Sequence, residues 1–360
     1  MNNTKNVAIA MSGGVDSSIS AVLLKEMGYR VTGIFMKNWE EDDEDNNCNV
    51  ADDYKDAKRV ADKLGINLLT VNFSDKYWQL VFQRLIDGLL SGITPNPDIF
   101  CNKEIKFKYF YQHILSLGYD QLATGHYAKV ENEDNKFKLK VANDWSKDQT
   151  YFLYMLQQNV LKNIIFPLEN ITKVEVKKIA KEFDLKISEK KESMGICFIG
   201  KKNFTKFIKQ YLKDNPGDIL DEFGNIIGQH LGLFNYTIGQ RKGLGIGGIS
   251  DTNNDPWFVL SKDVSSNNLV VTQDEKKLLY KGKLLLSSTS WVHDAPIANE
   301  KYSARFRHGG RLVPVLIEEI NKRYYVILEE YERAVTIGQS AVIYRDNECL
   351  GGGIIKQLFQ

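Results

Sequence analysis

The sequence lacks the hallmarks of several large protein classes. No apolar stretch approaches the roughly 18 residues that a membrane helix needs. The first residues, MNNTKNVAIAMSGG, contain only a short apolar run and no small-residue cleavage site, so we expect no signal peptide. The formal net charge is only +1, which excludes a global basic signature and leaves polyanion binding to local patches. We therefore expect a cytoplasmic protein with no membrane association.

Cysteine is also scarce, and its spacing excludes the common paired motifs. The four cysteines are Cys48, Cys101, Cys197 and Cys349, and none forms a C-x-x-C pair. A zinc ribbon or a thioredoxin motif is therefore not expected, and no metal site is predicted. A standing structural disulfide is disfavoured in a reducing compartment. Any thiol chemistry must come from single cysteines that folding brings together.

The first third of the chain alternates short apolar runs with amphipathic stretches. The runs typical of strands are residues 7–10, 31–36, 68–73 and 121–124, and those typical of helices are 17–27, 51–64, 76–90 and 103–117. This alternation predicts an α/β fold, an open parallel sheet with helices on both faces. At 360 residues the chain is long enough for two or three domains.

The rest of the chain is predicted to contain a hairpin and further helices, followed by a half of different composition. A hairpin is expected at 131–141 with Asp134 and Asn135 at its turn, followed by helices at 149–161, 173–183 and 204–212. After Pro216 and Gly217, short strands punctuated by Gly, Asn and Asp continue to the last residue, among them 303–306, 313–320, 324–329 and 341–344. The pair 313–320 and 324–329 is joined across Asn321 and Lys322. This part is predicted to be β-rich and barrel-like.

The first predicted strand runs directly into SGGVDSS, residues 12–18. Adjacent glycines allow a tight turn and a close approach to a bound group. The N–H groups at the start of the next helix would face an anion. It is not the Walker pattern, because no G-K-[ST] follows. The string instead resembles the PP-loop of ATP pyrophosphatases, which bind pyrophosphate and activate a substrate as an adenylate. A plain glycine turn is the alternative for a bare SGG.

Two cysteine-containing stretches raise the question of sulfur chemistry. In NPDIFCNKEIKF, residues 96–107, Asp98 precedes Cys101 at a predicted helix start. Around Cys197, seven lysines lie between Lys190 and Lys213, and cations favour the reactive thiolate. We place both cysteines in loops at the ligand-binding edge of the sheet. The alternatives are an inert packed thiol for Cys101 and a solvated lysine face beyond Lys202. A nucleotide-activating loop with two reactive thiols suggests sulfur transfer.

Along its whole length the chain resembles the tRNA-specific 2-thiouridylase family. The matching strings are AMSGGVDSS (10–18), TPNPDIFCNKEIKF (94–107), ATGHYA (123–128), KDQTYFLY (147–154), GICFIG (195–200), GQRKGLGIGG (239–248) and CLGGGII (349–355). The resemblance implies a PP-loop domain at 1–213, a central β-rich domain at 214–282 and a C-terminal β-barrel domain at 283–360. It implies that ATP with Mg²⁺ adenylates the C2 oxygen of the wobble uridine. Persulfide sulfur then replaces that oxygen to give 2-thiouridine, AMP and pyrophosphate.

The resemblance also implies roles for individual positions. Cys197 corresponds to the persulfide-bearing cysteine, Cys101 to the nucleophile and Asp98 to the general acid/base, with Asn96, Pro97 and Asp98 holding the target base. The positions that correspond to ATP contacts are Ala10, Met11, Ser12, Gly13, Gly14, Val15, Asp16, Ser17, Met36 and Gly125. Those that correspond to tRNA contacts are His126, Lys147, Asp148, Gln149, Arg305, Phe306 and Gln339. Two positions depart from the family pattern: Ala10 stands where Gly is frequent, and Phe306 where Tyr is common.

The implied partners are the tRNAs for lysine, glutamate and glutamine, and either a cysteine desulfurase or a sulfur-relay protein. Three rivals remain. A PP-loop enzyme with another acceptor would not need two loop cysteines, and a non-catalytic RNA-binding protein would not need the PP-loop. The third concerns mechanism alone: Asp98, Cys101 and Cys197 would hold an iron–sulfur cluster, a route we prefer less than the persulfide.

Overall fold

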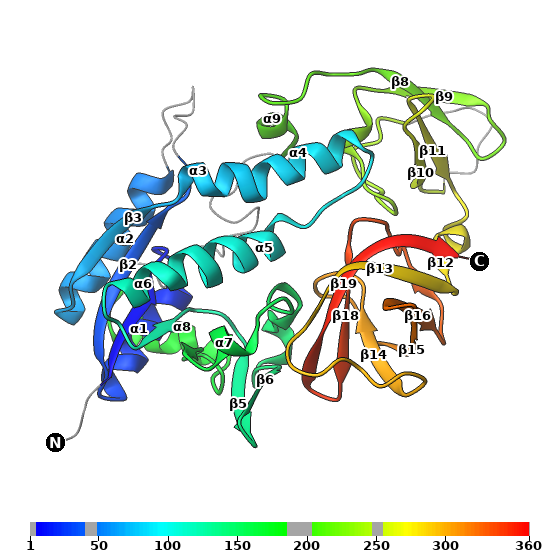
Figure 1. Ribbon diagram of the computed structural model, residues 1–360. Helices are drawn as coiled ribbons and strands as arrows, with labels where there is room; N and C mark the ends of the chain where they lie inside the picture. The colour runs from blue at the N-terminus through cyan, green and yellow to red at the C-terminus, as the bar shows by residue number, and fades with distance from the viewer. Residues whose placement is uncertain (1–4, 40–48, 186–203, 247–254, 360) are drawn as a thin grey trace.

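The structure is a computed structural model that describes residues 5–39, 49–185, 204–246 and 255–359 (Figure 1). An α/β part, drawn in blue to green, lies beside a barrel drawn in orange and red, and a smaller β-rich part lies above the barrel. No helix in the described ranges is long and apolar enough to cross a membrane.

The α/β part is built on a five-stranded sheet in the order β3-β2-β1-β4-β7. Every pair in it is parallel. The strands are β1 Asn6–Ala10, β2 Arg30–Lys37, β3 Leu68–Asn72, β4 Gln121–Ala123 and β7 Ile164–Ile165. The first four confirm the predicted parallel sheet, and β7 was not foreseen because it is only two residues long.

Helices cover both faces of this sheet, as predicted. On one face, Val7, Ile9 and Phe35 share a buried core with the helices α1 Val15–Glu26, α2 Asn49–Leu64 and α8 Lys173–Glu182. On the other face, Ala8, Ile34 and Met36 share a second core with the segment that contains Phe107 and Phe110. Successive strand residues point to opposite faces, so each strand contributes to both cores.

The two long helices of the second face differ from their predicted bounds. Each contains a π-helical segment: α3 Ser74–Tyr77, η1 Trp78–Phe82 and α4 Gln83–Leu90, then α5 Pro97–Phe100, η2 Cys101–Phe110 and α6 Tyr111–Ser116. The second begins early because Asn96 caps it: its Oδ1 accepts hydrogen bonds from the N–H groups of Asp98 (3.1 Å) and Ile99 (3.4 Å). Cys101 therefore lies inside a helical run and not in a loop, which corrects the prediction.

The predicted helix at 149–161 is also wrong. The chain there forms a single 3₁₀ turn, η4 Thr150–Phe152, and the short helix α7 Gln158–Leu161. Within this stretch, the hydroxyl of Tyr151 donates to the carbonyl of Ser340 (3.1 Å), and the hydroxyls of Tyr154 and Ser340 are 3.1 Å apart. Packing of these buried tyrosines against the barrel overrides the local helical pattern.

The C-terminal part confirms the predicted barrel. Its six strands follow the order β13-β16-β15-β14-β18-β19, and β19 pairs again with β13 to close it. They are β13 Lys283–Trp291, β14 Lys301–Arg305, β15 Val313–Ile320, β16 Arg323–Leu328, β18 Ser340–Arg345 and β19 Glu348–Phe359. Asn321 and Lys322, both with positive φ, form the predicted turn between β15 and β16.

The central part has a four-stranded sheet in the order β10-β11-β8-β9. Its strands are β8 Gly217–Leu220, β9 Ile226–His230, β10 Phe258–Asp263 and β11 Asn268–Thr272, and the helix α9 Phe204–Ile208 precedes it. The short strand β12 Leu279–Tyr280 pairs with β17 Glu332–Arg333. Contact between the central part and the barrel thus begins before residue 282, and the proposed domain boundaries stay a prediction.

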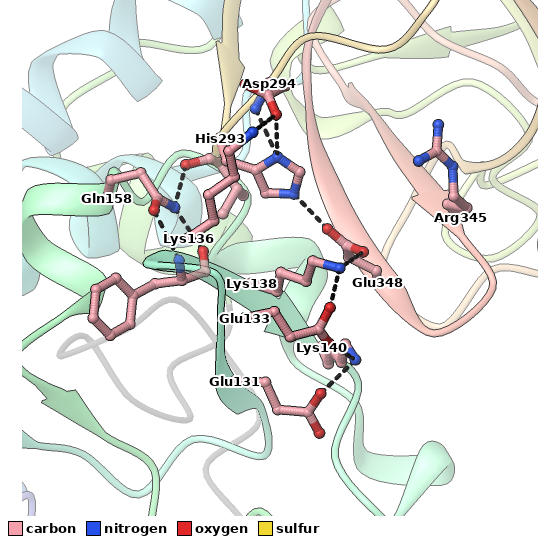
Figure 2. A network of polar contacts seen from close by, with 12 residues as sticks. Glu131, Glu133, Lys136, Lys138, Lys140, Gln158, His293, Asp294, Arg345 and Glu348 are labelled. Atoms are coloured by element: carbon pink, nitrogen blue, oxygen red, sulfur yellow. Dashed lines mark hydrogen bonds and ion pairs between the residues drawn. The ribbon is translucent and has the colours of Figure 1, made fainter.

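A hairpin of the α/β part joins the barrel sheet directly. Strands β5 Lys129–Glu133 and β6 Lys136–Lys140 turn at Asp134 and Asn135, as predicted, and β6 pairs with β19. Figure 2 shows the charged network over this joint. Glu348 of β19 contacts both His293 and Lys138, and Lys138 also pairs with Glu133 (2.5 Å).

Candidate functional site

The loop after β1 is tied together by serine hydroxyls at the start of α1. Ser17 Oγ accepts a hydrogen bond from the Ser12 N–H (3.2 Å) and donates to the Gly14 carbonyl (3.1 Å). Gly14 is the N-cap of α1, and no side chain caps the helix. Gly13 has a φ of +72°, and a Cβ there would lie 2.2 Å from the Asp53 carbonyl oxygen. The result is a tight loop that presents a helix N-terminus without a side-chain cap, the geometry of an anion site.

Lys173 contributes to this loop, although the sequence did not single it out. Its Nζ lies 2.6 and 2.8 Å from the two carboxylate oxygens of Asp16, and the Tyr127 hydroxyl donates to the same carboxylate (3.0 Å). Lys173 is buried at the first turn of α8, which Thr172 and Glu175 cap through a capping box. The capping box is visible in the sequence, but the distance from α8 to the loop is not.

Two other predicted ATP positions also adjoin the loop. A Cβ on Gly125 would lie 2.8 Å from the Ser17 nitrogen and 2.9 Å from the Asp16 carbonyl carbon, so only glycine lets the segment after β4 approach α1 this closely. Met36 is buried near the carboxyl end of β2, the strand next to β1. In an open α/β sheet this edge is where ligands bind.

The candidate nucleophile is on a second element at the same edge. Cys101 is fully buried in a cluster with Phe82, Ile105 and Trp39. Asp98 lies one turn earlier and is half-buried. Cys197, the predicted persulfide carrier, lies outside the described residues. The structure thus places Asn96, Pro97, Asp98 and Cys101 together on one helical run. It does not describe Cys197, the proposed sulfur partner of Cys101.

Two of the predicted tRNA positions contact each other across the junction with the barrel, and a third forms a hydrogen bond nearby. Asp148 and Arg305 form a buried ion pair. The backbone N–H and hydroxyl of Thr150 also donate to Asp148 (2.9 and 2.8 Å). Gln149 accepts a hydrogen bond from the Tyr127 N–H through its side chain (2.9 Å). The side chains of Asp148, Gln149 and Arg305 are therefore engaged in contacts that stabilise the fold near this junction.

The other tRNA positions vary in exposure. His126 packs between Phe107 and Phe166, and burial, with the nearby Lys106 cation, holds the pKa of His126 well below its usual range. Phe306 is buried in the barrel core, and Lys147 is half-buried.

The loop before β18 contacts the segment that precedes the helical run beginning at Asn96. Gln339 donates through Nε2 to the Thr94 carbonyl (2.5 Å), and a Cβ on Gly338 would lie 2.4 Å from a side-chain carbon of Ile93. Nearby, the ring of His308 stacks on Phe152 with centroids 4.4 Å apart. Partial burial lowers the pKa of His308, an effect opposed by the negative charges of Asp148 and Asp98. The barrel therefore borders the Asp98 side of the site.

The part of the chain that the structure describes contains no cluster of side chains that could bind a metal ion. No three His, Cys, Asp or Glu side chains among these residues are grouped to hold an ion. The third donor of the alternative iron–sulfur cluster, Cys197, lies outside these residues.

Comparison with known proteins gives a match along the whole chain. Residues 5–201 match the family described as tRNA methyl transferase HUP domain, 205–273 the tRNA methyl transferase PRC-barrel domain, and 281–355 the aminomethyltransferase beta-barrel domain. The tRNA-specific 2-thiouridylase of Methylobacillus flagellatus is 47% identical over 354 residues, covering 98% of each chain. That of Bacillus subtilis is 46% identical over 358 residues, covering 98% of this chain and 95% of the relative.

These relatives match the α/β part, the central part and the barrel together, at identities far above the level at which only a fold is shared. The family whose members span all three parts is thus the one that describes this chain as a whole. The chain belongs to the tRNA-specific 2-thiouridylase family, sulfurtransferases that act on tRNA.

Proposed function

We propose that the protein converts the wobble uridine of the tRNAs for lysine, glutamate and glutamine to 2-thiouridine. In the first step the C2 oxygen of uracil attacks the α-phosphate of ATP and pyrophosphate leaves. C2 is a poor electrophile until its oxygen becomes part of an AMP leaving group. The loop from Ala10 to Ser17, with Met36 and Gly125, would hold ATP together with its Mg²⁺, which would supply neutralisation of the phosphate charge.

In the second step sulfur replaces the activated oxygen. Cys197 would carry it as a persulfide, loaded by a cysteine desulfurase or a sulfur-relay protein in the cytoplasm. In one route Cys101 would attack the persulfide, forming a Cys101–Cys197 disulfide and expelling sulfide, which displaces AMP from C2. In the other, Cys101 would attack C2 itself and displace AMP, and the outer persulfide sulfur of Cys197 would then displace Cys101 from C2. The Cys101 thiolate would next cleave the resulting C2–S–S–Cys197 linkage, which gives 2-thiouridine and the same disulfide, and a thiol reductant would restore both cysteines. AMP leaves in either route. Asp98 would move the proton, and Asn96 and Pro97 would help to hold the flipped base.

The observation that carries the proposal is the pairing of two features at one sheet edge. The serine-tied loop gives α1 an N-terminus suited to pyrophosphate. The helical run that begins at Asn96 carries Asp98 and Cys101, and its residue Ile99 belongs to the same buried core as Met36 near the end of β2. Nucleotide activation and a thiol are both needed for thiolation, and neither rival function needs both.

The test is mass spectrometry of wobble nucleosides after incubation with ATP, tRNA and a sulfide source. We expect 2-thiouridine in the complete mixture and none without ATP. Formation of 2-thiouridine without ATP, or tRNA binding with no thiolation at all, would contradict the proposal. Anaerobic purification with an iron assay separates the persulfide route from the cluster route.

A further inference from the structure

Buried polar atoms without partners are concentrated beside the candidate nucleophile. Among the described residues, ten buried side-chain nitrogen or oxygen atoms have no hydrogen-bond partner, and five of them belong to Asn38, Trp39, Thr94 and Asn102. Asn102 directly follows Cys101, and Thr94 precedes the Asn96 cap. Since buried polar groups are nearly always hydrogen-bonded in native proteins, such a concentration needs an explanation.

Asn38 is the extreme member of this group. Its exposed fraction is 2%, and both Nδ2 and Oδ1 lack partners. An unpaired buried amide destabilises the folded state, whereas a leucine of similar size at the same place would not. An amide that folding does not use is available to a ligand.

The position of Asn38 shows which ligand it can meet. Asn38 directly follows β2, at the carboxyl edge of the sheet, where open α/β folds bind their ligands. The next residue, Trp39, packs on Phe82 with ring centroids 4.9 Å apart and belongs to the same core as Cys101. The buried amide therefore belongs to the residue that directly precedes a member of the Cys101 core.

We propose that Asn38 is a positioning residue that hydrogen-bonds the imide edge of the target uracil. A carboxamide offers one acceptor beside one donor. Oδ1 would accept from uracil N3–H and Nδ2 would donate to O4, which leaves O2 free for adenylation. The adenine of ATP also presents a donor beside an acceptor, so ATP is the other source of this chemistry. The inference rests on the proposed function.

The test compares Asn38→Leu with Gln121→Leu in the full-length chain. Gln121 is the matched control, because its Oε1 is also buried without a partner but it begins β4, at the opposite edge of the same sheet. Binding is measured with a tRNA that carries uridine or an abasic site at the wobble position, and ATP affinity is measured without tRNA. Thermal unfolding is followed for each variant.

For Asn38→Leu we expect loss of most of the preference for uridine over the abasic site, at least a tenfold fall in thiolation, unchanged ATP affinity and no loss of thermal stability. Gln121→Leu should keep the wild-type preference. A weakened ATP affinity with an unchanged uridine preference would assign the amide to adenine and overturn the uracil contact. An unchanged preference and unchanged rate would reduce Asn38 to a buried amide with no ligand.

The binding readout separates this inference from the proposed function. If the wild-type protein prefers uridine at the wobble position but does not thiolate it, the proposed function fails while the contact can still be read from the variant. If the wild-type protein thiolates tRNA but has no preference for uridine over the abasic site, the Asn38 contact is overturned and the function stands.

Discussion

Asp148 and Arg305, 157 residues apart in the sequence, form a buried ion pair that joins the α/β part to the barrel. The Asp148 side chain is 1% exposed and that of Arg305 is 10% exposed. Thr150 satisfies further lone pairs of the carboxylate, and the guanidinium also lies over the Tyr344 ring at 5.3 Å. A buried pair of this kind stabilises little by itself, but loss of one partner leaves an uncompensated charge.

We therefore expect Arg305→Met to lower the free energy of unfolding by about 3–5 kcal/mol. Asp148→Asn combined with Arg305→Met should recover part of the loss, because no buried charge then remains. Urea unfolding of both single variants and the double variant measures the coupling. Lys178→Met is the control: its pair with Glu182 is largely exposed, so its effect should stay below about 1 kcal/mol. Equal losses of stability in Arg305→Met and Lys178→Met would show that the Asp148–Arg305 pair is not buried in solution.

Lys173 is expected to support the nucleotide loop through Asp16. In Lys173→Met the Asp16 carboxylate loses a charge-assisted hydrogen bond and would repel phosphates, so adenylation should fall about 10- to 100-fold. Asp16→Ala and Ser12→Ala should abolish thiolation and largely spare tRNA binding. Initial-rate assays over a range of ATP concentrations check this, with the exposed Lys177→Met as control. A normal ATP dependence in Lys173→Met would remove Lys173 from the site.

Gly125→Ala should damage the same loop by steric conflict. Its Cβ would meet backbone atoms at the start of α1, which cannot move as a side chain can. We expect at least tenfold weaker ATP binding, measured by calorimetry. Gly228→Ala is the comparison, because its nearest neighbour would be an ordinary 3.7 Å away. Wild-type ATP affinity in Gly125→Ala would mean that the segment after β4 is farther from α1 than the structure shows.

The burial of Cys101 predicts its reactivity. In the protein without ligands, iodoacetamide should label Cys101 slowly, because the thiol is fully buried. With tRNA and a non-hydrolysable ATP analogue we expect faster labelling, since the proposed chemistry requires access. Cys349 serves as an internal control: burial raises the pKa of its thiol and it should stay unlabelled in both states. Peptide mass spectrometry gives both rates, and a Cys101 that never becomes labelled would argue against its role as nucleophile.

Stability should depend on pH through Lys262 of the central part. Burial lowers the pKa of Lys262 from 10.5 to about 8, and its Nζ has no hydrogen-bond partner among the described residues. Between about pH 8 and pH 10.5, Lys262 binds more protons in the unfolded state than in the folded state. Its contribution to the free energy of unfolding therefore rises with pH in this range. Relative to Lys262→Met, the wild-type protein should gain stability from pH 8 to pH 10. Parallel urea-unfolding curves at each pH would contradict the lowered pKa.

Local patterns predicted the elements whose conformation depends on neighbours in the sequence. The strand Val313–Ile320 has its predicted bounds, and the turns at Asp134 and Asn321 were identified from residues that tolerate positive φ. The predicted loop at Cys101 failed because the helical run is capped five residues earlier, at Asn96. The helix predicted at 149–161 failed because Tyr151 and Tyr154 bond to a strand nearly 190 residues away.

In the candidate site, too, features within one short segment could be predicted, and contacts between distant segments could not. The glycine and serine positions of the PP-loop could be recognised because one turn contains them all. The contact of Lys173 with Asp16, and that of Arg305 with Asp148, could not, because each joins segments that meet only after folding. The positions carried over from the family resemblance remain predictions until ligand-bound measurements test them.

The shared core of the hairpin and barrel has a consequence for synthesis of the protein on the ribosome. Leu139, Val141 and Tyr154 are buried together with Val342, Tyr344 and Cys349, which are translated much later. While the barrel strands are still being made, the apolar face of the hairpin has nothing to cover it. The nascent α/β part therefore exposes an apolar surface until β18 and β19 have been synthesised and can cover it. A chain arrested before Ser340 should be a preferred client of ribosome-associated chaperones.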